Sequence, residues 1–130
     1  MNGIPLQQSL FFNVIPMPDS IKTARMIYLT LKTVVMKAYV IVEVSITDKI
    51  QYEEYKKLTP ASIAAYEGRF LVRGGKTEPL EGDWHPERMV VVEFPSVERA
   101  RQWWHSDEYS QAKAIRKHSA QTKMLIVEGA

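Results

Sequence analysis

Hydrophobic and polar residues alternate along two stretches of the chain, and both stretches are predicted strands. In residues 37–46 one face is wholly apolar, and the other face carries Tyr39, Ile41, Glu43 and Ser45. In residues 88–94 one face is again apolar, with Val90, Val92 and Phe94. The other face of that stretch holds Met89, Val91 and Glu93. Each strand is therefore expected to be buried on one side and partly polar on the other.

Apolar spacing predicts helices between and after these strands. Residues 49–66 are expected to form a helix that directs Tyr52, Tyr55 and Ile63 inward and is kinked or split at Pro60. A second helix carries Val97, Ala100, Trp103 and Trp104, and a third carries Tyr109, Ala112 and Ile115. Candidate N-caps precede all three helices: Asp48, Ser96, and either Ser106 or Asp107.

Two shorter strands, at 69–74 and 123–128, complete the order βαββαβ. The predicted fold class is α+β: a ferredoxin-like, four-stranded antiparallel sheet with helices on one face. The first and third strands are the most apolar, which favours them as the central pair, with the short strands at the edges. Because both crossovers contain helices, these two central strands are expected to pair in parallel.

Helices cover only one face of this sheet, so the other face would remain exposed to solvent in a single subunit. That face carries Tyr39, Ile41, Met89 and Val91. A second subunit packed face to face would cover these side chains. We therefore expect a homodimer, with Glu43 and Glu93 in the same interface.

The composition changes at Met36, which suggests a boundary between two regions. Residues 1–35 contain three prolines and show no clear period, and they are expected to be an N-terminal extension. One interpretation is a wrongly assigned start, with Met36 as the natural first residue. The alternative is an added strand or arm, because the segment MIYLTLKTVV is rich in residues that favour strands.

Residues 36–130 are expected to form one domain, because 130 residues leave no room for two ordinary cores. The chain has no cysteine, which excludes disulfides and thiolate chemistry and fits a cytoplasmic protein. Its net charge of +2 lies wholly in residues 1–35, so the domain lacks the basic patch of a nucleic-acid binder. Lysines interrupt the apolar run near residue 35, which argues against a membrane span.

Two carboxylates are candidates for acid–base chemistry. Glu43 and Glu93 lie in the middle of the central strands on the same predicted face. Two close carboxylates raise one pKa and create a general acid. The structural alternative is that each carboxylate pairs with an arginine, such as Arg69 or Arg73, across the dimer interface.

A possible ligand site is indicated where the second strand ends. Arg73 offers a fork for a carboxylate, and Gly74 and Gly75 allow a ligand to approach the backbone. In the loop that follows, His85 is a candidate base and Trp84 a candidate lid. The alternatives are an ordinary glycine turn, an ion-pair arginine and a surface histidine.

Trp103 and Trp104 are adjacent in a helix, so they cannot share a face. One is expected in the core and the other along a cleft or interface, with Trp103 kept as a candidate ligand contact. The histidines lack metal-ligand spacing, so no metal site is predicted. No phosphate loop, nucleophile elbow or dinucleotide fingerprint appears, and no cofactor is predicted.

The motifs FLVRGG, LEGDW, VVVEFPS, SDEY and LIVEG make residues 37–130 resemble a bacterial family of domains of unknown function, numbered 1330. Where members of that family commonly read Ser-Pro-Glu-Tyr, this chain has SDEY at 106–109. The resemblance implies a place in the dimeric α/β-barrel superfamily, whose barrel is made from two sheets. That superfamily includes cofactor-free monooxygenases and stress-response proteins, so the fold alone chooses no activity.

Two functions follow as hypotheses. In the first, a homodimer binds a small anionic or aromatic molecule near Gly74 and Gly75, with cofactor-independent isomerase or oxygenase chemistry. Arg73 then anchors the substrate, and Glu93 or His85 moves a proton. In the second, the protein is a non-catalytic dimeric binding or stress-response module, and the charged residues form interface ion pairs.

Overall fold

The computed structural model describes residues 19–130, and the chain divides into two units, Met1–Val35 and Met36–Ala130. In the first unit, helix α2 spans Asp19–Val34. The added strand expected in MIYLTLKTVV is therefore wrong. Strand-favouring composition depends on packing context, so it does not by itself decide the structure of this segment. Residues 1–18 of the predicted extension lie outside the described residues, and the assignment of Met36 as the start stays a prediction.

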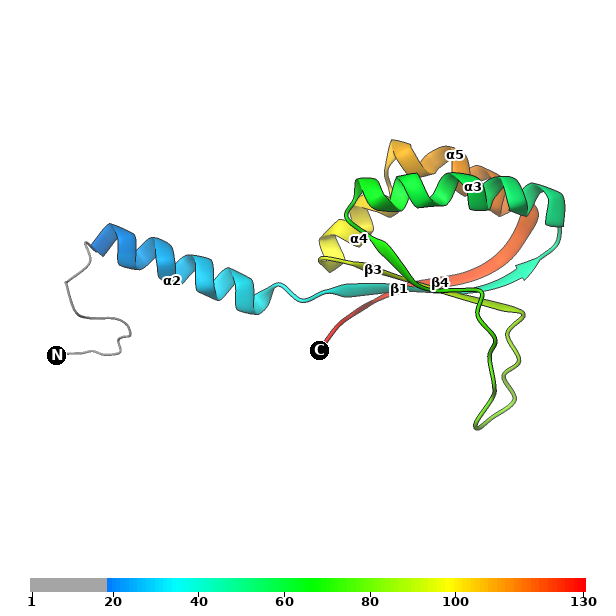
Figure 1. The fold of residues 1–130 in the computed structure, drawn as a ribbon, viewed down its shortest axis with the longest axis horizontal. Helices are drawn as coiled ribbons and strands as arrows, with labels where there is room; N and C mark the ends of the chain where they lie inside the picture. Colours follow the sequence, from blue (N-terminus) through cyan, green and yellow to red (C-terminus); the bar gives the residue numbers. More distant parts are fainter. Residues whose placement is uncertain (1–18) are drawn as a thin grey trace. The chain divides into compact units, whose positions relative to one another are not determined.

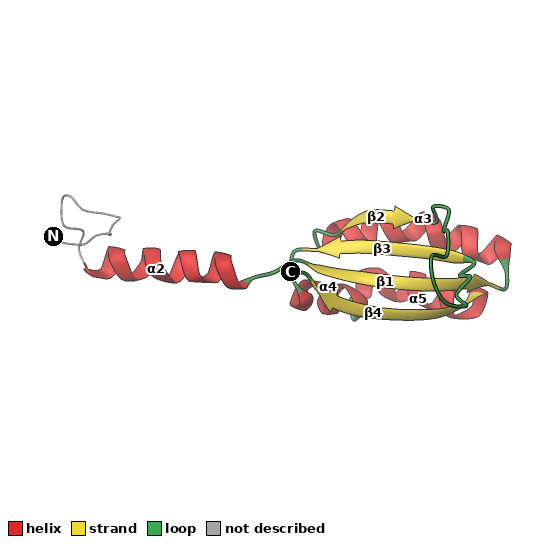
Figure 2. Ribbon diagram, turned by 90° about the horizontal axis from the view of Figure 1, so that it is seen from below, coloured by secondary structure: helices red, strands yellow, loops and turns green. Residues whose placement is uncertain are grey.

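The second unit is a four-stranded antiparallel sheet with helices on one face, the ferredoxin-like arrangement (Figure 1). Its elements follow the order βαββαβ, with the second crossover made of two helices. They are β1 (Ala38–Ile46), α3 (Lys49–Ala65), β2 (Arg69–Arg73), β3 (Arg88–Phe94), α4 (Val97–Trp104), α5 (Asp107–Ser119) and β4 (Ala120–Glu128). The strands lie in the order β2-β3-β1-β4, so the two alternating stretches form the centre of the sheet (Figure 2).

Two expectations about the strands are wrong. β1 and β3 pair antiparallel, because each helical crossover joins strands that have another strand between them. The right-handed crossover rule applies to those separated parallel pairs, β1 with β2 and β3 with β4. In addition, β4 begins at Ala120 and has nine residues, so it is an edge strand but not a short one.

The three predicted N-caps are confirmed, and each lies at the residue where a helix begins. Asp48, Ser96 and Ser106 each accept a hydrogen bond from the backbone N–H three residues later. Such caps satisfy amide groups that the first helical turn leaves free. Pro60 does not split α3, which is continuous from Lys49 to Ala65.

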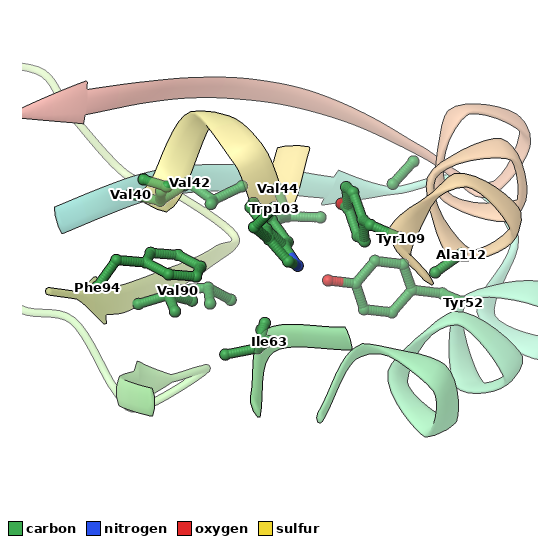
Figure 3. Packing of buried hydrophobic residues seen from close by; sticks show 13 residues of the cluster. Val40, Val42, Val44, Tyr52, Ile63, Val90, Phe94, Trp103, Tyr109 and Ala112 are labelled. Carbon is green, nitrogen blue, oxygen red and sulfur yellow. The ribbon is translucent and has the colours of Figure 1, made fainter. Parts of the chain in front are cut away.

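The core lies between the helices and the apolar face of the central strands (Figure 3). Trp103 is at its centre, between Phe94 and Tyr109, with ring centroids 5.4 Å and 4.1 Å away. The indole N–H of Trp103 donates to Ser62 Oγ at 3.1 Å, which satisfies its polar atom. Packing of this kind explains why alternation in two strands and aromatic spacing in the helices predicted the fold.

Candidate functional site

The predicted site residues divide between the two faces of the sheet. Arg73 lies opposite Val90, whose side chain is buried under the helices, so Arg73 is on the helical face. Glu43 and Glu93 occupy the other face, which we call the open face. The loop between β2 and β3 also projects from the side away from the helices (Figure 1). Arg73 and Trp84 therefore do not share one pocket, contrary to the predicted site.

Glu93 forms ion pairs within its own chain. Its carboxylate accepts from Arg69 Nε at 2.9 Å and lies 3.5 Å from Lys37 Nζ, with 11% of its side chain exposed. The hydrogen bond from Arg69 lowers the pKa of Glu93, and Lys37 adds to that effect. The side chain is therefore held as a carboxylate at neutral pH, which suits an ion-pair partner and not a general acid.

Glu43 is held by a different partner and lies away from Glu93. Trp84 Nε1 donates to the Glu43 carboxylate at 3.1 Å. Glu93 is opposite Tyr39, whereas Glu43 is four residues further along β1, opposite Met89. At the rise of a strand, that is a separation of about 13 Å. The two carboxylates share a face as predicted, but the register does not bring them together as an acid–base pair.

Replacing Glu93 with glutamine should lower the Tm at neutral pH and leave it nearly unchanged in acid. A carboxyl whose folded pKa is lowered stabilises the protein above its unfolded pKa, near 4.5, and that stabilisation is lost as the pH falls through the folded pKa. The Tm difference between wild type and E93Q should therefore narrow below about pH 4.5. A difference of the same size at pH 3 and pH 7 would show that ionisation of Glu93 does not matter.

Arg73 has a structural partner that depends on Pro60. Proline has no N–H, so the carbonyl of Lys56 lacks its usual helical donor. Arg73 Nη2 donates to that carbonyl at 2.7 Å and lies 3.5 Å from Thr59 Oγ1. The guanidinium also stacks over the Phe70 ring at 4.4 Å. The Nη2 atom of Arg73 thus links β2 to α3, and the other N–H groups of the guanidinium remain available to a ligand.

Of the two glycines after Arg73, only Gly74 is required by the backbone. Gly74 has φ +78° and its N–H donates to the Met89 carbonyl at 2.8 Å, closing the turn. A Cβ at Gly74 would fall on the guanidinium of Arg88, whereas a Cβ at Gly75 would meet nothing within 4 Å. Gly74 is therefore explained by its turn and by the close approach of Arg88.

His85 is an exposed loop residue, with 69% of its side chain accessible and Asp83 at 3.5 Å. Within residues 19–130, no group of three or more metal-binding side chains is close enough to hold an ion. None of the described helices has the length and apolar character needed to span a membrane.

The adjacent tryptophans separate as their spacing predicts. Trp103 is 2% exposed and belongs to the core, whereas Trp104 is partly exposed. Lys113 Nζ lies 3.5 Å from the centre of the Trp104 ring and donates to the Trp104 carbonyl at 2.7 Å. Burial lowers the pKa of Lys113. Trp104 also lines a groove beside β4, which is described below.

Arg116 is a residue that the sequence reasoning missed. It is only 5% exposed, and it donates through Nε to the Tyr109 hydroxyl at 3.2 Å and through Nη1 to Thr122 Oγ1 at 2.5 Å. The Tyr109 hydroxyl in turn lies 2.9 Å from that of Tyr55, whose pKa is raised by burial and then by Tyr109. Among the described residues, no carboxylate lies within 4 Å of Arg116. The spacing of Tyr109, Ala112, Arg116 and Ser119 on one helical face was the signal that could have found it.

Arg116 lies at the meeting point of two hollows on the helical face. A narrow cavity of about 30 Å³ runs between helices and sheet, and a groove of about 600 Å³ lies beside β4. Trp103, Arg116 and Met124 line both. No acidic residue is among the described residues that line them. The other lining residues of the groove are mostly apolar: Val40, Ala100, Trp104, Lys117, Ala120, Thr122, Leu125 and Ile126.

The open face has an apolar row with one residue on every strand of the sheet. Figure 2 shows the four strands that the row crosses. The row runs in the order Val72, Val91, Ile41 and Leu125. Leu125 is 57% exposed and Val72 is 39% exposed. The other predicted interface residues, Tyr39 and Met89, lie in neighbouring rows of the same face and are partly exposed.

The family of the chain is shown by its sequence. Residues 37–130 match the family described as Domain of unknown function (DUF1330). No curated protein matches the chain. The match covers the whole of the ferredoxin-like unit except its first residue, so it includes every candidate site residue described above.

Solved structures show the same fold at low sequence identity. A protein of unknown function from Rhodopseudomonas palustris has 13% identity and a TM-score of 0.62, over 82% of this chain and 93% of that chain. SnoaB, a cofactor-independent oxygenase from Streptomyces nogalater, has 9% identity and a TM-score of 0.51, over 73% of this chain and 94% of its own. At such identities the likeness concerns the fold and not the activity. The chain therefore belongs to the DUF1330 family, domains of unknown function, with a ferredoxin-like fold.

Proposed function

We propose that the protein binds a small aromatic carboxylate in the groove beside β4, with Arg116 as its anchor. The observation that carries this proposal is the buried guanidinium of Arg116, which has hydroxyl partners and no carboxylate among the described residues. Removing a charge from water is costly unless an opposite charge compensates it. A ligand carboxylate in the groove supplies that charge.

The walls of the groove fit the remainder of such a ligand. Trp103, Trp104 and Met124 offer aromatic and thioether surface, and the volume of about 600 Å³ is in the range of small-molecule sites. The Tyr55 hydroxyl keeps its proton because burial raises its pKa. It lines the narrow cavity and not the groove, and it stays neutral beside the Tyr109 hydroxyl that accepts from Arg116.

The proposed function is binding without turnover. The carboxylates considered for proton transfer are engaged elsewhere, since Glu93 pairs with Arg69 and Glu43 accepts from Trp84. The oxygenase activity of SnoaB is supported here by the fold alone, which does not transfer chemistry. Arg116 takes over the anchoring role predicted for Arg73, whose fork is partly committed to Lys56.

Cinnamate should bind more tightly than its neutral amide, and replacing Arg116 with glutamine should remove that preference. A hydrogen bond to a charged group contributes about 1.5–3 kcal/mol, so the affinity for cinnamate should fall by roughly 10- to 100-fold. Calorimetric titration of the full chain measures both ligands. Lys117→Gln is the matched control, because Lys117 is an exposed cation lining the same groove.

Circular dichroism of R116Q separates loss of binding from loss of fold. Equal affinity for cinnamate and cinnamamide in the wild type would contradict the carboxylate anchor. So would an R116Q variant that keeps the native spectrum and binds cinnamate as the wild type does.

We also propose that two copies of the chain pair through the open face. The sheet measures about 19 Å across its strands and about 23 Å along β3, the scale of a small protein interface. The apolar row lies in its middle, and the ion pairs of Glu93 lie to one side. The loop between β2 and β3, which projects from the open face, adds Leu80 and Trp84, which are 95% and 56% exposed. A second copy would cover apolar surface that one subunit leaves in water.

A further inference from the structure

A third hollow, on the helical face near the end of β2, is lined by four cations and one carboxylate. It has a volume of about 330 Å³, and we call it the basic hollow. Its described lining residues are Glu53, Lys56, Lys57, Arg73 and Arg88. None of the residues that line the β4 groove belongs to it, whereas Lys56, Arg73 and Arg88 also line the narrow cavity that reaches Arg116.

The lysines of the basic hollow are neutralised locally, but its arginines are not. Lys56 pairs with Glu53 at 2.8 Å, and Lys57 pairs with Glu54 at 3.0 Å. Among residues 19–130, neither Arg73 nor Arg88 has a carboxylate within 4 Å. Two guanidinium groups therefore line the hollow without an ion pair, although Glu53 shares the hollow and its pKa is lowered by Lys56 and, to a smaller extent, by the charge of Arg88. The excess of positive charge favours an anionic ligand.

The sheet brings these two arginines together. Arg73 is opposite Val90 on the neighbouring strand, and Arg88 precedes Val90 by two residues on the same face. Such diagonal neighbours in an antiparallel pair have Cα atoms about 7–8 Å apart, within reach of long side chains. The Nη atoms of Arg88 and the part of the Arg73 guanidinium that Lys56 and Thr59 leave free can therefore contact one small anion.

Arg88 carries a buried polar atom whose hydrogen bonding is not satisfied. Its Nε is buried and has no hydrogen-bond partner within the described part of the chain. The guanidinium stacks over the Tyr52 ring at 5.6 Å, and Gly74 leaves the space beside it free of a side chain. An unsatisfied buried donor destabilises a protein. Because protein atoms cover this Nε, the Nη atoms of Arg88 are the ones that a ligand in the hollow would contact.

We propose that the basic hollow binds the phosphate group of a small phosphorylated molecule. A phosphate carries up to two negative charges and several acceptor oxygens, so it matches two guanidinium forks and the nearby Lys56 better than a single carboxylate does. The volume of the hollow accommodates the phosphate and a short organic part. This site shares no lining residue with the β4 groove proposed for the carboxylate.

The test uses inorganic phosphate as the probe, with chloride at equal ionic strength as the reference. Phosphate should shift the NMR signal of the Arg88 Nε–H in the full chain. Arg88→Met should weaken phosphate binding at least tenfold, whereas Arg99→Met, which removes an arginine paired with Glu67 at 3.5 Å, should not. Because R88M removes an unsatisfied buried donor and keeps the aliphatic stem, its Tm should be equal to or higher than that of the wild type.

Three results would overturn the proposal. One is phosphate binding by R88M as tight as that of the wild type. Another is a Tm of R88M several degrees below the wild type, which would assign Arg88 a structural role. The third is acetate binding as tightly as phosphate, which would remove the preference for a phosphate group.

Discussion

Replacing Trp103 with alanine should lower the free energy of unfolding by about 3–5 kcal/mol, a large part of the stability of a domain of this size. The side chain is 2% exposed and packs between Phe94 and Tyr109. Its loss leaves a cavity and also deprives Ser62 of the indole donor. Urea denaturation followed by circular dichroism measures the change.

Trp104→Ala is the matched control for that measurement. Trp104 is adjacent in sequence but partly exposed, with its ring against Lys113. Its replacement removes less buried surface and should destabilise the protein by no more than about 1.5 kcal/mol. Equal losses in the two variants would mean that Trp103 is not the centre of the core.

Replacing Ile41 with aspartate should convert the proposed dimer to a monomer. Ile41 occupies the middle of the apolar row, between Val91 and Leu125. A charge there would face the apolar surface of the second copy without a partner, and the dissociation constant should rise by at least 100-fold. Sedimentation velocity over a range of concentrations measures this change.

Ile50→Asp provides the control for the effect of an added charge. Ile50 is 78% exposed and belongs to the first turn of α3, away from the open face. Its variant should sediment as the wild type does. A wild type that is monomeric at high micromolar concentration would refute the dimer, and a dimeric I41D would place the interface elsewhere.

The sequence predicted most of the fold because its main signals are local. Alternation located β1 and β3, and polar residues before apolar runs located all three N-caps. The relative direction of β1 and β3 was not local, since it depends on which strand each crossover passes over. The strand prediction for the segment before Met36 was wrong for another reason: its composition favours a strand, but strand propensity depends on packing context, and the segment is helical.

The candidate site was predicted less well, because it depends on register and on single long side chains. Glu43 and Glu93 lie on one face, but a separation of four residues along the strands decides their chemistry. The partner of Arg73 depends on a carbonyl that Pro60 leaves free on another element. Arg116 occupies a buried helical position where apolar residues are expected, so the apolar spacing of the helix did not indicate it.

The position of β1 in the sheet has a consequence for how the domain folds. β1 is central, yet its partner β4 is about 80 positions away in the sequence. Closing such a long loop costs chain entropy before the contacts of the paired strands stabilise the fold. The pairing of β1 with β4 therefore forms only after the last strand has been made. We therefore expect the sheet to form late during synthesis on the ribosome. Until then, the apolar residues of β1 are accessible to chaperones.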